Sequence, residues 1–197
     1  NDAVEIGNAM INYLITGQGS WIPGTPSAFS CHGLEYKDVS NGLIRQLREA
    51  IVWRYERQME GELFIPKDIT VGVDRFHIVG LNEGALRNLD ISAVNLPPDI
   101  RTIPRECFYS CYNLADVKFH GETTFIEDNA FGLCHSLKSI RLPSSVKFLG
   151  SHCFQQSGLE SIVIPKSIET LGPYAFYTCR DLRKVVFTGH RLNDLQG

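Results

Sequence analysis

The chain has 197 residues, which is enough to bury a complete hydrophobic core without disulfide or metal cross-links. Apolar residues make up 43% of it and charged residues 21%, as in an ordinary globular domain. The formal net charge of −3 excludes a global positive field that would attract nucleic acid or an anionic membrane. No apolar run reaches the roughly 18 residues of a membrane-spanning helix, so membrane insertion is not expected.

Residues 1–61 carry no clean repeat and are predicted to form a helical N-terminal cap or a small separate domain. Apolar residues recur at helical spacing in 2–15 and again in 40–59, where Ser40 is a candidate N-cap. A loop rich in glycine and proline, 17–26, separates the two predicted helices. A cap is expected because the end of a repeat stack otherwise exposes core side chains.

Residues 62–90 are predicted to be a degenerate first copy of a repeat. The sequence LFIPKDI at 63–69 echoes IVIPKSI at 162–168. We therefore expect a domain boundary near residue 61, followed by a solenoid over 62–197.

From residue 91 the chain repeats itself every 22–23 residues, in four full copies over 91–181 and a final strand over 182–187. A unit of this length cannot bury its own apolar side and must stack on its neighbours. Each copy begins with a pattern like L-x-x-I-x-I, whose last two apolar residues face the same side of a short strand. Each copy should thus add one rung to a parallel sheet. One phenylalanine per copy is predicted to fill each core layer: Phe108, Phe131, Phe154 and Phe176.

This repeat is similar to that of a known family. The pattern I-P-x-S-[VI]-x-x-L-G-x-x-[AC]-F-x-x-C, seen at 164–179, resembles the BspA-like class of leucine-rich repeats. The second copy departs from it, with His120 and Gly121 where proline is expected. The resemblance implies an α/β fold, a right-handed leucine-rich-repeat solenoid with a parallel β-sheet face and short turns, here preceded by the helical cap. It also implies a secreted or surface protein that acts in adhesion or ligand binding.

The six cysteines indicate packing rather than chemistry. Five of them share two repeat positions and are predicted to be small, buried, reduced core residues: Cys107, Cys111, Cys134, Cys153 and Cys179. The sixth, Cys31, lies outside the repeat beside His32, and we expect it to be the thiol most accessible to reagents. No nucleophile signature surrounds it, so no catalytic residue is predicted.

Other candidate chemical sites are explained by the repeat or by surface charge. His135 and His152 fall at different turn positions of adjacent copies, which indicates solvated side chains and no metal site. The arginines of 45–57 alternate with glutamates, which is typical of a solvated face and not of a nucleic-acid interface. No cofactor is predicted.

The positions between the inward residues of each predicted strand point outward and differ from copy to copy. A variable surface on a constant core is typical of a binding site on a scaffold, although an unused sheet face fits the same pattern. Two cations beside an apolar strip make this face a candidate partner site. We expect eight of its residues to bind the ligand: Asp116, Lys118, Ser139, Arg141, Ser161, Val163, Lys184 and Val186.

The sequence thus predicts a non-catalytic protein-binding or adhesion module, extracellular or at the cell surface, with cytoplasmic location as the alternative. Its partner would be another protein or a host or matrix ligand. The alternative function is an enzyme or effector whose activity lies in 1–60 or in parts outside this chain, with the repeats as targeting domain. The tail after residue 187 is too short for a full repeat. We expect Leu192 and Leu195 to fold back over the last rung, with weak self-association through the C-terminal edge as the alternative.

Overall fold

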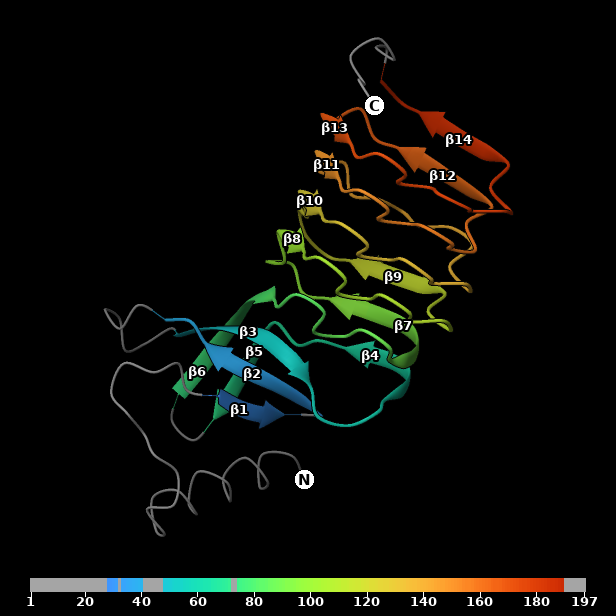
Figure 1. Ribbon diagram of the computed structural model, residues 1–197. Coiled ribbons are helices and arrows are strands. Elements are labelled where there is room, and N and C mark those ends of the chain that lie inside the picture. The colour runs from blue at the N-terminus through green and yellow to red at the C-terminus, as the bar shows by residue number, and fades with distance from the viewer. Residues whose placement is uncertain (1–27, 32, 41–47, 72–73, 190–197) are drawn as a thin grey trace.

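The computed structural model describes residues 28–31, 33–40, 48–71 and 74–189, and over these residues it contains fourteen strands and no helix. Figure 1 shows a sheet near the N-terminus and, above it, a stack of short strands that continues toward the C-terminus. The helix predicted at 2–15 and the predicted fold-back of Leu192 and Leu195 lie outside the described residues.

The five strands near the N-terminus form one sheet, which we call the N-terminal sheet. They are β1 (Ala28–Cys31), β2 (Leu34–Asp38), β3 (Arg48–Tyr55), β5 (Asp68–Val71) and β6 (Asp74–Leu81). The strand order is β1-β2-β3-β6-β5, and only the central pair β3 and β6 is parallel. The sheet buries apolar side chains from its three middle strands, including Leu34, Tyr36, Val52 and Ile78.

The helix predicted over 40–59 with Ser40 as its N-cap is wrong, because residues 48–55 form β3 in the middle of this sheet. Buried Ala50 and Val52 are separated by a half-buried residue, which is the alternation of a strand. The segment is rich in β-branched and aromatic residues, which favour sheets, and strands pair with it on both sides. These contacts outweigh the helical spacing of its apolar residues, so the expected helical cap is a sheet wherever the structure describes it.

The solenoid has two walls of parallel strands, on opposite sides of the stack in Figure 1. The front wall contains β4 (Glu60–Phe64), β7 (Asp90–Leu96), β9 (Asp116–Phe119), β12 (Ser161–Ile164) and β14 (Lys184–Phe187). The back wall contains the two-residue strands β8 (Thr102–Ile103), β10 (Phe125–Ile126), β11 (Phe148–Leu149) and β13 (Thr170–Leu171). Successive copies of the repeat lie on one another and enclose the core between the walls, as the period predicts.

The front wall is interrupted at 137–142, where one strand is expected. Its inward residues Leu137, Ile140 and Leu142 are buried, but the segment forms no strand, and β9 and β12 belong to separate sheets. Within the described residues, no backbone hydrogen bond joins 139–142 to either neighbour. This rung is therefore held mainly by its buried side chains.

A column of stacked phenylalanines runs through the core. Phe108, Phe131 and Phe154 are fully buried, and Phe176 ends the column half-buried. Successive ring centroids lie 5.3, 5.6 and 5.8 Å apart, with interplanar angles of 5°, 6° and 3°. The near-parallel rings confirm that this repeat position supplies one core residue to each layer.

The six cysteines are free thiols, and five of them are buried. Cys111 donates its thiol to the backbone carbonyl of Leu86 in the preceding layer, over 3.1 Å. Burial raises the pKa of Cys111 to about 12, so this thiol stays protonated and unreactive. The expectation that Cys31 is the most accessible thiol is wrong, because Cys31 is buried whereas Cys179 near the end of the stack is half-buried.

The turns that lead from the back wall to the front wall share an unusual backbone. Each contains two residues, four apart, in the left-handed region, with φ between 52° and 63°. The pairs are Glu106 and Ser110, Asn129 and Leu133, His152 and Gln156, and Tyr174 and Thr178. Residues other than glycine adopt this region at an energetic cost, so the turn geometry is imposed by the stacking of the layers.

A polar bridge joins the N-terminal sheet to the solenoid. His77 on β6 lies with Nδ1 2.8 Å from Asp68 Oδ1 on β5 and with Nε2 3.0 Å from Asp99 Oδ2, in the loop after β7. Arg75 adds a 2.7 Å ion pair to the same Asp68. The imidazole is only 16% exposed, so these contacts fix the sheet against the first layer of the stack.

Candidate binding surface on the front wall

The strands of the front wall separate core residues from surface residues by alternation. In β12, Ile162 and Ile164 are buried, while Ser161 and Val163 are exposed. Strand β9 shows the same alternation. The side chains between the core positions therefore project from the outer face of the wall, where a partner can reach them.

The structure places all eight predicted ligand-binding residues on this outer face. They are Asp116 and Lys118 on β9, Ser139 and Arg141 on the interrupted rung, Ser161 and Val163 on β12, and Lys184 and Val186 on β14. Seven are exposed and Val186 is half-buried. The register of β12 and β14 aligns Ser161 with Lys184 and Val163 with Val186, so the residues form two columns along the stack.

The charges at the N-terminal end of this face form ion pairs with one another. Lys118 Nζ lies 2.8 Å from Glu62 Oε1 and 3.9 Å from Asp116 Oδ2. Asn95, on the strand between them, donates to the same Glu62 oxygen at 2.5 Å. Hydrogen bonds from Lys118 and Asn95 lower the pKa of Glu62, and the hydrogen bond to Glu62 raises the pKa of Lys118. Lys118 is therefore already occupied by partners within the protein.

The cations at the C-terminal end of the same face have no such partners. Among the residues that the structure describes, neither Arg141 nor Lys184 makes an ion pair or a side-chain hydrogen bond. Val163, which is 51% exposed, lies on the rung between theirs. We call Arg141, Val163, Lys184 and Val186 the C-terminal patch. It combines two available positive charges with an apolar centre.

Sequence reasoning missed two residues of this surface, Glu62 and Phe64 on β4. Strand β4 pairs in parallel with β7, which pairs with β9, so both columns continue by two rungs to β4. Phe64 is 65% exposed, more than any other large apolar side chain in the described part of the chain. The echo between 63–69 and 162–168 places Phe64 at the position of Val163, so the sequence contained the information needed to find it.

The residues considered for other chemistry occupy packing positions. The His135 ring lies tilted against Tyr112, and His152 stacks on Tyr174, both with ring centroids 5.1 Å apart. Within the described ranges, no group of three or more His, Cys, Asp or Glu side chains is placed to hold a metal ion. The pairing considered for Cys31 involves His32, which lies outside those ranges.

The family follows from the repeat. Residues 77–194 match the BspA type leucine rich repeat region, in six copies. The chain belongs to this family. The match begins on β6 and so extends upstream of the four copies at 91–181 that are evident from spacing alone.

Solved structures share this fold. A leucine-rich repeat protein from Bacteroides ovatus is 21% identical, with a TM-score of 0.63 over 85% of this chain. The leucine rich repeat protein of T. pallidum is 27% identical, with a TM-score of 0.62 over 70%. The pneumococcal vaccine antigen PcpA is 20% identical, with a TM-score of 0.53 over 83%. The chain spans 41%, 63% and 38% of these three chains, respectively.

Among curated proteins, none matches this chain in sequence. In the part of the chain that the structure describes, no helix is long and apolar enough to cross a membrane.

Proposed function

We propose that this chain is a non-catalytic protein-binding or adhesion module that holds its partner on the front wall. The observation that carries the proposal is the C-terminal patch. Arg141 and Lys184 lack partners within the described residues, and exposed Val163 lies between them. Protein interfaces commonly centre on apolar and arginine side chains that become desolvated together.

The chemistry of the patch defines the kind of partner that fits. An acidic protein surface would supply carboxylates for Arg141 and Lys184, and an apolar side chain between them would contact Val163. Arginine suits this role because its planar guanidinium binds a carboxylate through two hydrogen bonds. Exposed Phe64 would then form an apolar flank of the same interface, beyond the ion-paired Lys118.

A matched pair of double variants tests this function. Arg141→Glu with Val163→Asp changes the front wall, and Arg101→Glu with Phe125→Asp makes the same kinds of change on the back-wall side. All four residues are exposed, so both variants should fold. We expect partners selected with the native protein from a displayed library of extracellular proteins to bind the front-wall variant at least about tenfold more weakly. Equal binding by the native protein and the front-wall variant would contradict the proposal.

The compartment forms part of the same proposal, in which the protein acts outside the cell or at its surface. The support is the surface and secreted occurrence that the family resemblance implies. Of the solved structures with this fold, one is called a pneumococcal vaccine antigen and another a leucine rich cell surface protein from Faecalibacterium prausnitzii. Labelling of intact cells with a membrane-impermeant amine reagent tests the location. Labelling that occurs only after lysis would rule it out.

A further inference from the structure

A one-residue deletion alters the corner that precedes one front-wall rung. In three of the four full copies, two residues stand between a cysteine and the first inward leucine of the next rung. These residues are Tyr112 and Asn113, His135 and Ser136, and Arg180 and Asp181. In the remaining copy, Gly158 alone connects Ser157 to Leu159. The column of large side chains formed by Tyr112, His135 and Arg180 therefore has no member at the level of Gly158.

The backbone at this corner leaves no room for a replacement side chain. A Cβ on Gly158 would lie 1.9 Å from the backbone oxygen of His135, which is far inside contact distance. The Gly158 N–H also donates to the backbone oxygen of Cys134 at 3.1 Å, which holds the two layers together. The flanking side chains of His135 and Arg180 are two rungs apart, roughly 10 Å at about 4.8 Å per rung. The result is an open notch of about 370 Å³.

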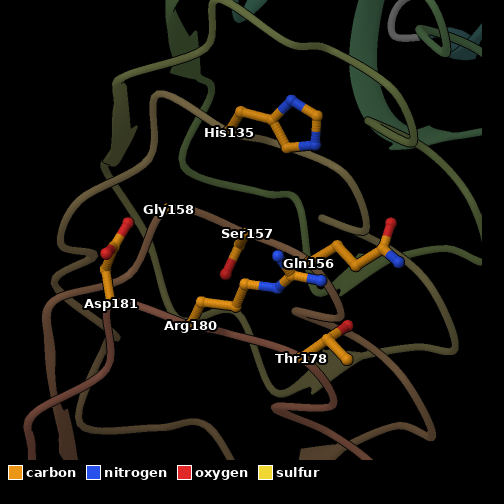
Figure 2. A pocket seen from close by; sticks show the side chains of 7 residues that line it. All are labelled: His135, Gln156, Ser157, Gly158, Thr178, Arg180 and Asp181. Carbon is orange, nitrogen blue, oxygen red and sulfur yellow. The ribbon is translucent and has the colours of Figure 1, made fainter.

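Polar side chains line the notch, as Figure 2 shows. The lining residues are His135, Gln156, Ser157, Gly158, Thr178, Arg180 and Asp181. The Arg180 side chain extends toward Ser157 and Gln156, whereas Asp181 points to the other side of Gly158 (Figure 2). Over the described ranges, the Arg180 guanidinium makes no ion pair or hydrogen bond.

We propose that this notch is a binding site for a carboxylate group, with Arg180 as its charged contact. The guanidinium presents paired donors that match the two oxygens of a carboxylate, and Gln156 and Thr178 offer further donors nearby. Asp181 shares the lining, and its negative charge selects a singly charged carboxylate over a doubly charged phosphate. The carboxylate can come from an acidic protein side chain or from a sugar acid, because both carry the same group.

The site is separate from the front-wall patch and does not rest on the proposed function. The notch residues precede the strands, whereas the C-terminal patch lies on the outer faces of the rungs themselves. A titration of isotope-labelled protein by NMR tests the site with four probes. The probes are N-acetyl-L-glutamic acid α-amide, D-glucuronate, D-glucose and inorganic phosphate.

We expect at least one of the two carboxylates to give saturable shifts of the amides around Gly158 and Arg180, with a Kd of about 1–10 mM. The probe that binds more tightly identifies the source of the carboxylate. Glucose should give no saturable shifts, and phosphate should bind more weakly than the carboxylate. Failure of both carboxylates to saturate, or tighter binding of phosphate, would overturn the proposal.

Charge variants distinguish carboxylate binding in the notch from nonspecific attraction of a carboxylate to positive surface charge. Arg180→Gln should weaken carboxylate binding about tenfold or more, and Asp181→Asn should strengthen it, because one removes the attraction and the other the repulsion. Arg183→Gln is the matched control, since Arg183 is exposed nearby but does not line the notch. Equal losses in Arg180→Gln and Arg183→Gln would refute the site. The front-wall variant Arg141→Glu with Val163→Asp should titrate like the native protein, so failure of the proposed function would leave this result intact.

Discussion

The N-terminal sheet and the solenoid are stabilised by different kinds of contact. In the N-terminal sheet, each stabilising contact occurs once: Arg48 on β3 binds both Asp38 on β2 and Asp74 on β6, which are far apart in the sequence. In the solenoid, each layer repeats its neighbour, and the phenylalanine column uses one contact several times. Stability in the sheet should therefore depend on individual residues, whereas in the solenoid it should depend on position along the stack.

The strongest test of this difference is a cavity in the middle of the phenylalanine column. Phe154→Ala should lower the free energy of unfolding by about 3–5 kcal/mol, because the ring is fully buried between two others. Phe176→Ala should cost clearly less, because Phe176 is half-buried at the end of the column. Urea unfolding measures both, with exposed Arg141→Ala as a control that should shift stability by less than about 0.5 kcal/mol. Equal losses for Phe154→Ala and Arg141→Ala would contradict the assignment of core and surface.

A single charge should matter in the N-terminal sheet. Arg48→Gln leaves Asp38, which is 8% exposed, without its cation, and should cost about 1–3 kcal/mol of stability. Adding Asp38→Asn should restore part of the loss, because the uncompensated buried charge is then absent. Lys138→Gln breaks a fully exposed pair with Glu160 in the solenoid and should leave the urea midpoint unchanged. A larger effect at Lys138 than at Arg48 would reverse the comparison.

Replacing a strained residue of the left-handed turns by glycine should raise stability, and this gain should be specific to the solenoid. All nine non-glycine residues with positive φ in the described chain lie at or beyond Asn88. Thr178 has φ of 52°, which is costly for a β-branched side chain. Thr178→Gly should raise stability by about 0.5–1 kcal/mol, since relief of this strain exceeds the entropy cost of glycine. Thr170→Gly, at a position in β13 that is also exposed, should lower stability instead. Thermal melts of the two variants should therefore move in opposite directions.

The smallest effect should be a pH dependence at the bridge between the two parts. Burial raises the pKa of Asp68, but hydrogen bonds from His77 and Arg75 outweigh it, so the pKa lies below its ordinary value. A carboxyl with a lowered folded-state pKa contributes stability above its unfolded pKa of about 4 and loses it as the pH falls through the lowered value. Melting temperatures between about pH 5 and pH 2 should therefore fall more steeply in the native protein than in Asp68→Asn. Asp99 also faces His77, so Asp99→Asn in the same series shows whether the slope belongs to Asp68.

The period explains why the solenoid was predictable from the sequence and the N-terminal sheet was not. The positions of Phe154 and Ile162 recur with similar residues every 22–23 residues, so each copy supports the same assignment of core positions. Residues 48–55 have no copy elsewhere, and their strand partners β2 and β6 are distant in sequence, so local spacing alone suggested a helix. The missing ladder at 137–142 also escaped prediction, because its apolar pattern matches that of paired β12.

The candidate surface shows the same limit. The outward columns followed from alternation, but the neutralisation of Lys118 did not, because its partner Glu62 lies 56 residues away and reaches it across β7. Only the register of three strands places that carboxylate beside the amine. Alternation therefore shows which side chains face outward, whereas the charge that they present depends on the fold.

The interrupted rung at 137–142 makes strand pairing continuous in one wall of the solenoid and discontinuous in the other. The back-wall strands β10, β11 and β13 pair without a break past this level, whereas the front wall has no ladder there within the described chain. Stacked repeats open first at their weakest interface. Local opening should therefore separate the front wall between β9 and β12, while the back-wall strands stay paired and act as the hinge. Amide protons of 139–142 would then exchange with solvent well before those of β10 and β11. The front wall would be the face that can spread to admit a wider partner.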